Sequence, residues 1–163
     1  MDYLVTMTTH VPDGTPDDAV DDVRRREAAR AAQLASEGHL LRLWRPPLQP
    51  GEWRTLGLFR ADGEDELEKG LASMPLRVWR TDEVTALGPH PNDPQPERTG
   101  PDGGRLEFLT TFTVAVPDGT PAGAVDDVRA REAARARELG DAGKLIRLWA
   151  LPRQPGQIGR AHV

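Results

Sequence analysis

Two adjoining segments near the N-terminus decide the fold: Tyr3-Leu-Val-Thr-Met-Thr-Thr-His-Val11 and Pro12-Asp-Gly-Thr-Pro16. Apolar and polar residues alternate in the first segment, which predicts a strand with one buried face. The second segment predicts a turn, and Thr15 is the expected N-cap of a helix whose first residue is Pro16. This helix is expected to run to about Glu37, where Gly38 ends it. The chain therefore opens with a strand followed by a long helix.

Further along the chain, apolar runs over 40–45, 53–61 and 78–87 predict three more strands, and residues 62–73 predict a second helix. The order strand-helix-strand-strand-helix-strand is that of a ferredoxin-like α+β domain, in which an antiparallel sheet carries its helices on one face. A core built from so short a domain is small. We therefore expect sheets to pair between subunits.

The sequence also repeats itself. Residues 11–51 align without a gap with residues 116–156, and most aligned positions are identical. For example, Arg26-Glu-Ala-Ala-Arg30 returns as Arg131-Glu-Ala-Ala-Arg135. The second copy contains no counterpart of residues 54–90. The chain is therefore expected to hold one full domain and an incomplete second one.

The repeat sets the expected domain boundaries. A complete domain covers 1–90, a Pro/Gly-rich linker covers 91–105, and a truncated second βαβ copy covers 106–156. Residues 157–163 can be encoded by a common sequencing-adapter sequence, so we expect this tail to be non-native. The alternative is a natural truncation.

Composition narrows the class of protein. Lys and Arg number 21 against 26 Asp and Glu, giving a net charge of −5, which argues against a nucleic-acid partner. Cysteine is absent, which excludes disulfides, thiolate metal sites and cysteine nucleophiles. No apolar run approaches the ~20 residues of a membrane helix, and the N-terminus does not resemble a secretory signal. We expect a soluble cytoplasmic protein without a membrane partner.

One carboxylate, that of Glu27, lies where the first helix should be apolar. The stripe around it consists of Val20, Val23, Ala31 and Leu34. Burial against the sheet would raise the pKa of Glu27 and make it a better base near neutrality. Such a group can remove a proton from carbon next to a carbonyl. The alternative is a plain ion pair with Arg24, Arg26 or Arg30 at the helix edge. Glu132 occupies the same place in the second copy.

Other candidate site residues follow the first helix. Arg42 and Arg45 flank Trp44, and we expect both arginines on the strand face opposite to Trp44. There they could hold a substrate carboxylate or simply face solvent. Trp44 and Trp53 are candidates for core or pocket wall. The scattered histidines lack metal-ligand spacing, and no P-loop, dinucleotide fingerprint or Ser-His-Asp arrangement is present.

Several short segments recur in the order and spacing of one enzyme family. They are Tyr3-Leu-Val-Thr-Met-Thr8, Arg26-Glu27, Glu37-Gly38, Leu43-Trp44-Arg45, Leu58-Phe59, Met74-Pro75-Leu76 and His90-Pro91. With them, residues 1–91 resemble a muconolactone delta-isomerase domain. Residues 106–156 resemble the first half of the same domain.

This resemblance implies a fold and an activity. The fold is the ferredoxin-like α+β fold that pairs into dimeric α/β barrels and assembles into larger homo-oligomers. The activity shifts a double bond in muconolactone to give the enol-lactone of 3-oxoadipate, in the catabolism of aromatic compounds, with no cofactor or metal. Glu27 would be the catalytic base. The residues expected to bind the lactone substrate are Arg42, Trp44, Arg45 and Trp53.

Some segments depart from the family pattern. Residues 46–54 and Arg77-Val-Trp79 differ from the family's usual pocket residues, and Arg45 becomes Ala150 in the second copy. The substrate and the activity of the second copy therefore stay open. Two alternatives remain: a non-catalytic small-molecule-binding or assembly domain, and a cofactor-independent monooxygenase or cyclase of the same barrel type.

Overall fold

The computed structural model describes residues 1–49, 51–94 and 107–152. Contacts divide the chain into two units: Met1–Gly88 together with Ala150–Val163, and Pro89–Trp149. Each unit is treated by itself below. Most of the expected linker and the whole of the expected tail, 157–163, lie outside the described residues.

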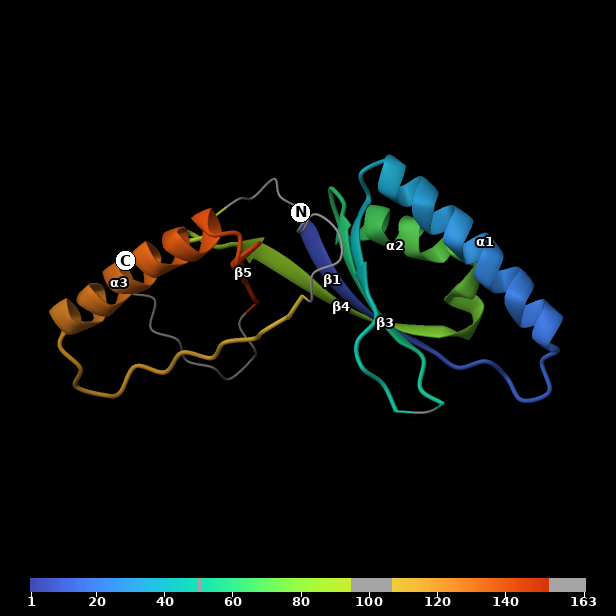
Figure 1. Cartoon of the computed structure of the whole chain (residues 1–163), viewed down its shortest axis with the longest axis horizontal. Coiled ribbons are helices and arrows are strands. Elements are labelled where there is room, and N and C mark those ends of the chain that lie inside the picture. Colours follow the sequence, from blue (N-terminus) through green and yellow to red (C-terminus); the bar gives the residue numbers. More distant parts are fainter. Residues whose placement is uncertain (50, 95–106, 153–163) are drawn as a thin grey trace. The chain divides into compact units, whose positions relative to one another are not determined.

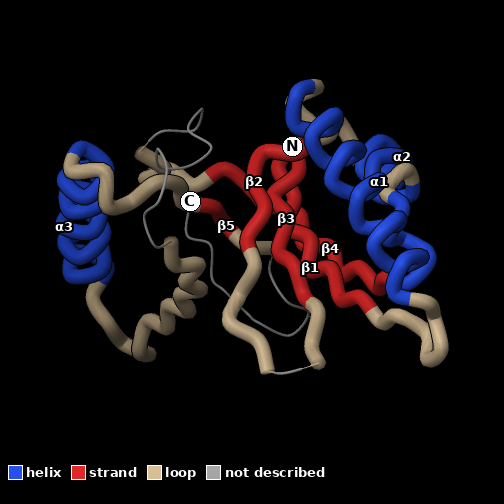
Figure 2. Tube along the Cα trace, turned by 45° about the vertical axis from the view of Figure 1, so that its right-hand side comes forward, coloured by secondary structure: helices blue, strands red, loops and turns tan. Residues whose placement is uncertain are grey.

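The first unit is an antiparallel sheet with two helices on one face (Figures 1 and 2). Its strand order is β2-β3-β1-β4, and Ala150 of the two-residue strand β5 (Trp149–Ala150) extends that order beyond β4. The α+β class and the predicted order of elements are confirmed. The elements are β1 (Asp2–Thr9), α1 (Asp17–Ser36), β2 (Leu40–Trp44), β3 (Arg54–Arg60), α2 (Glu64–Ala72), the 3₁₀ helix η1 (Pro75–Trp79) and β4 (Arg80–Pro89).

The core lies between the helices and one face of the sheet. In β1 every second residue is buried, as the alternation predicts. Tyr3, Val5 and Met7 pack there with Leu34 of α1 and with Leu71 of α2. Residues directly opposite each other on antiparallel strands share a face. Their β4 partners therefore also face the helices; these are Ala86, Val84, Asp82 and Arg80, opposite Tyr3, Val5, Met7 and Thr9.

The two ends of α1 show one wrong prediction and one confirmed. Thr15 is not the N-cap, because its hydroxyl donates to the carbonyl of Pro12 at 2.7 Å and closes the preceding turn, while Pro16 caps the helix through its backbone alone. Gly38 does end the helix, with φ of 80°. The amide of His39 donates to the carbonyl of Leu34 at 2.9 Å, which is the pattern of a Schellman motif.

The last strand begins later than predicted. Residues 78 and 79 belong to η1, and β4 starts at Arg80. Pro75 favours this short helix, because its ring fixes φ at a helical value in the first position.

Gly57 offers a test of core packing. It lies opposite Val5, and a Cβ added there would sit 2.5 Å from Cε2 of Phe59 and 2.9 Å from Cε of Met7. Gly57→Ala is therefore expected to lower the free energy of unfolding by about 1–3 kcal/mol in urea titration. Gly70→Ala is the control, because no atom lies within 4 Å of its added Cβ. Equal stability of Gly57→Ala and the wild type would contradict this packing.

The second unit contains one long helix, α3 (Ala122–Asp141), as the repeat predicts. Residues 107–116, the counterpart of β1, form no strand, so the predicted βαβ copy is wrong in this part. The reason lies in the sheet of the first unit, where β1 pairs with β3 and β4, and β2 pairs with β3. The second copy has no counterpart of β3 or β4, so its counterparts of β1 and β2 lack the strands with which they would pair.

Candidate active site

Glu27 lies on the side of α1 that packs against η1. Its side chain is 13% exposed. One carboxylate oxygen, Oε2, accepts the backbone N–H of Leu76 at 2.9 Å, and the other, Oε1, accepts Nη1 of Arg80 at 3.1 Å. A carboxylate offers about four lone-pair positions, so two donors leave it able to accept a further proton. The group is thus held by the protein and largely removed from water.

The fold explains why Leu76 meets this carboxylate. Pro75 and Leu76 open η1, and the first N–H groups of a helix have no partner inside the helix. The carboxylate of Glu27 satisfies one of them. The Met74-Pro75-Leu76 segment therefore brings a backbone donor to α1 and leads the chain directly into Arg80.

Arg80 is a buried cation at the start of β4. Its side chain is 2% exposed, and that of Asp82 is 3% exposed. Nε and Nη2 of Arg80 donate to the two oxygens of Asp82 at 2.6 and 3.0 Å. Arg77 also donates to Asp82, and its Nη2 donates to Glu68 at 2.8 Å. Glu27 therefore ends a chain of alternating charges.

Sequence reasoning did not single out Arg80 or Asp82. A usable signal was present, since residues two apart on a strand share a face. The expected alternative for Glu27 was an ion pair with an arginine of its own helix. Instead Arg24 pairs with Asp21, Arg26 with Asp22 and Arg30 with Glu37.

Trp53 lies beside the same part of α1. The guanidinium of Arg24 stands 4.6 Å from the centre of its ring. Arg24 precedes Glu27 by three residues, and side chains at that spacing are neighbours on a helix. The backbone carbonyl of Trp53 accepts the amide of Thr9 at 2.9 Å, which fixes this loop to the end of β1.

The other predicted binding residues do not join Glu27. Arg42 pairs with Leu58 and Trp44 with Leu56 in the β2–β3 ladder, whereas Leu43 pairs with Gly57. Arg42 and Trp44 therefore share one face, opposite to that of α1 and α2, and the prediction that the arginines lie opposite to Trp44 is wrong for Arg42. Arg45 is exposed and follows the last residue of β2.

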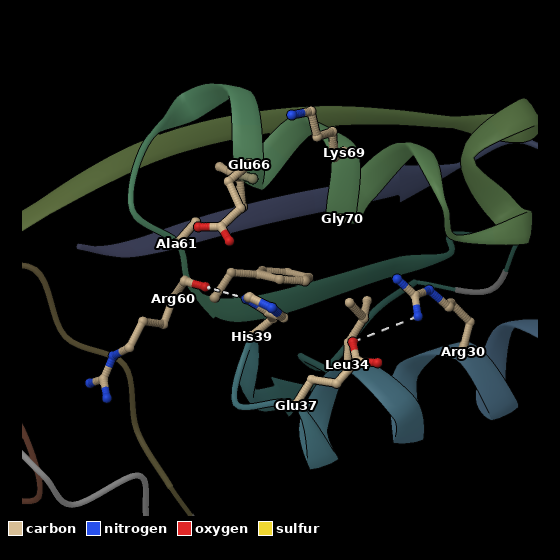
Figure 3. A pocket seen from close by; sticks show the side chains of 11 residues that line it. Arg30, Leu34, Glu37, His39, Arg60, Ala61, Glu66, Lys69 and Gly70 are labelled. Atoms are coloured by element: carbon tan, nitrogen blue, oxygen red, sulfur yellow. Dashed lines mark hydrogen bonds and ion pairs between the residues drawn. The ribbon is translucent and has the colours of Figure 1, made fainter.

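Neither of two open cavities in the first unit is lined by Glu27. One, of about 160 Å³, lies between α1 and α2 and is shown in Figure 3. Among its lining residues, Arg30 forms an ion pair with Glu37 at 3.8 Å, and Nδ1 of His39 lies 3.4 Å from the carbonyl of Arg60. The other, of about 440 Å³, is lined by residues such as Tyr3 and Glu68.

The described residues contain no group of three or more His, Asp or Glu side chains placed to hold a metal ion. In the same part of the chain, no helix is long and apolar enough to cross a membrane. In the second unit Glu132, the counterpart of Glu27, is exposed on α3.

Comparisons with known proteins show which family the chain resembles. The family model of muconolactone delta-isomerase matches residues 1–93 and 106–163. A muconolactone delta-isomerase of Cupriavidus pinatubonensis is 36% identical over 90 residues, which cover 55% of this chain and 95% of the relative. One from Acinetobacter lwoffii is 30% identical over 90 residues, covering 55% of this chain and 91% of the relative. A crystal structure of muconolactone isomerase superimposes with a TM-score of 0.51 and 26% identity, covering 56% of this chain and 92% of the other. The chain belongs to the muconolactone delta-isomerase family.

Proposed function

We propose that this chain converts muconolactone into the enol-lactone of 3-oxoadipate and that Glu27 is its catalytic base. Membership of the family makes the chain an isomerase of aromatic-compound catabolism. The observation that carries the assignment to Glu27 is its placement. It is a carboxylate 13% exposed, held at both oxygens, in the domain that the relatives match.

The proposed reaction moves one proton and one double bond. The Glu27 carboxylate removes a proton from a ring carbon, and the electron pair of that C–H bond enters the conjugated system as a dienolate. The protonated carboxyl then returns the proton to another carbon of the same system. Nothing is oxidised or reduced, and substrate and product have the same atoms, so the carboxyl group alone can act as the shuttle.

The substrate also carries a carboxylate, which needs an anchor. We propose Arg24 for this role, because it lies one helical turn from Glu27 and stacks on Trp53. Trp53 keeps its proposed role as pocket wall. Arg42 and Trp44 lie on the other face of the sheet, so they are not part of this site within one domain.

The strand order β2-β3-β1-β4, with both helices on one face, supports a ferredoxin-like domain of the dimeric barrel type. We propose that the chain forms homo-oligomers through it. Light scattering on the purified protein should give a mass at least twice that of a single chain, which is 17.9 kDa. A monomeric mass at all concentrations would contradict this proposal.

The activity is tested on the full chain with muconolactone, followed by ultraviolet absorbance and by proton NMR of the product. Turnover is expected without added cofactor and in the presence of a metal chelator. Absence of turnover above the protein-free rate would reject the isomerase proposal. Calorimetric binding of muconolactone without turnover would favour a non-catalytic binding domain instead.

A further inference from the structure

We propose that Arg80 and Asp82 are positioning residues of the isomerase site, which together fix the carboxylate of Glu27 in the orientation for proton transfer. The proposal rests on the proposed function, since it takes Glu27 as the base. It adds two residues of β4 to a site otherwise formed by α1, η1 and the loop before β3.

The first step in the argument is the geometry of the guanidinium group. Nε and Nη2 of Arg80 donate hydrogen bonds to the two oxygens of Asp82 at 2.6 and 3.0 Å, which fixes the plane of the guanidinium group. The remaining nitrogen, Nη1, then points to Oε1 of Glu27 at 3.1 Å and lies 3.8 Å from Sδ of Met74. Rotation of the guanidinium would break the contacts with Asp82, so Asp82 determines where Glu27 finds its donor.

The second step is that both oxygens of Glu27 are fixed from different elements. Leu76 of η1 holds Oε2 and Arg80 of β4 holds Oε1. One donor would leave the carboxylate free to swing about its contact, whereas two donors define its plane. Proton transfer between carbon and oxygen depends steeply on such alignment, and a displacement of 1 Å can cost about 100-fold in rate.

The third step is the burial of charge. Arg80 and Asp82 face the helices at positions whose β1 neighbours include Met7, a buried apolar residue. Their side chains are 2% and 3% exposed. Apolar residues of similar size would fill such positions as well or better for stability alone. Packing therefore does not account for this pair, whereas orientation of Glu27 does.

The decisive experiment removes both charges at once. In the double variant Arg80→Met/Asp82→Leu, apolar side chains replace the pair, Glu27 keeps the N–H of Leu76 and its partly exposed edge, and Arg77 keeps its contact with Glu68. We expect a folded protein whose kcat falls roughly 10- to 100-fold while KM changes less than about threefold, since substrate binding is untouched. Arg80→Lys keeps the charge but not the planar group, so its kcat should lie between those of the wild type and of the double variant.

Two comparisons separate positioning from a merely structural role. The control Arg60→Met/Asp2→Leu removes another ion pair of the sheet, with an Nε–Oδ1 distance of 2.9 Å, and should leave kcat unchanged. In a Glu27→Gln background, Arg80→Met/Asp82→Leu should lower kcat no further, because its effect passes through Glu27. Wild-type kcat in the folded double variant would overturn the proposal. So would an equal fold-loss of kcat in the wild-type and Glu27→Gln backgrounds.

Failure of the proposed function would look different, because the wild type itself would then not convert muconolactone. The contact between Arg80 and Glu27 is still testable by urea unfolding of four proteins. These are the wild type, Glu27→Gln, Arg80→Met/Asp82→Leu and the variant that combines all three changes. Coupling between the Glu27→Gln change and the Arg80→Met/Asp82→Leu change in the free energy of unfolding would support the orientation of Glu27 by this pair. Additive effects would overturn it.

Discussion

Glu27→Gln is expected to lower kcat for muconolactone about 100-fold or more, with the fold retained. The amide has the shape of the carboxylate, and its oxygen can still accept the N–H of Leu76. It cannot accept and return a proton, so the loss should fall on kcat rather than on KM. Steady-state kinetics measures the effect, and circular dichroism checks the fold.

The chain supplies a matched control for this change. Glu132 has the same sequence neighbours in the second copy but is exposed on α3. Glu132→Gln should therefore keep the wild-type kcat. Turnover that survives Glu27→Gln would remove Glu27 from the mechanism. Loss of turnover in Glu132→Gln would show that the second copy takes part in the reaction.

Residues 106–163 expressed alone are expected not to fold, whereas residues 1–90 should unfold cooperatively in urea. The strands β1 and β2 lie on either side of β3, so neither pairs with the other. A segment with counterparts of β1 and β2 alone cannot build a ladder, and α3 by itself has no sheet to cover its apolar side. The expected NMR spectrum of 106–163 has narrow amide dispersion.

A dispersed spectrum and a cooperative urea transition for residues 106–163 would contradict this account of the second copy. Self-association of that segment is a further outcome to measure, because strands without partners tend to pair with other chains. A dispersed spectrum that appears only at high protein concentration would show such pairing. It would leave the account of the single copy intact.

The local sequence was sufficient to predict most of the secondary structure of the first unit. Alternation in residues 3–9 identified the buried face of β1, and Gly38 identified the end of α1 with its backbone conformation. These features depend on neighbours in sequence. The apolar stripe around Glu27 likewise placed this carboxylate on the packed side of its helix.

Features that depend on pairing were missed. Alternation alone places Arg42 on the same face as Trp44, two residues on, but which face of the sheet this is follows from the β2–β3 register, which shifts between Leu40 and Arg42. The contact of Arg80 with Glu27 joins residues 53 positions apart. In the second copy, similarity to β1 predicted a strand over residues 107–116, but these residues form none, because the strands that would pair with them are missing.

A crystal structure with an unreactive muconolactone analogue bound tests the central claim most directly. We expect the analogue between Glu27 and Trp53, with a ring carbon within about 3.5 Å of a Glu27 oxygen, which is the range of a reactive approach. Leu76 and Arg80 should still hold the carboxylate. An analogue seated instead in the cavity beside Arg30 and His39, away from Glu27, would contradict the account.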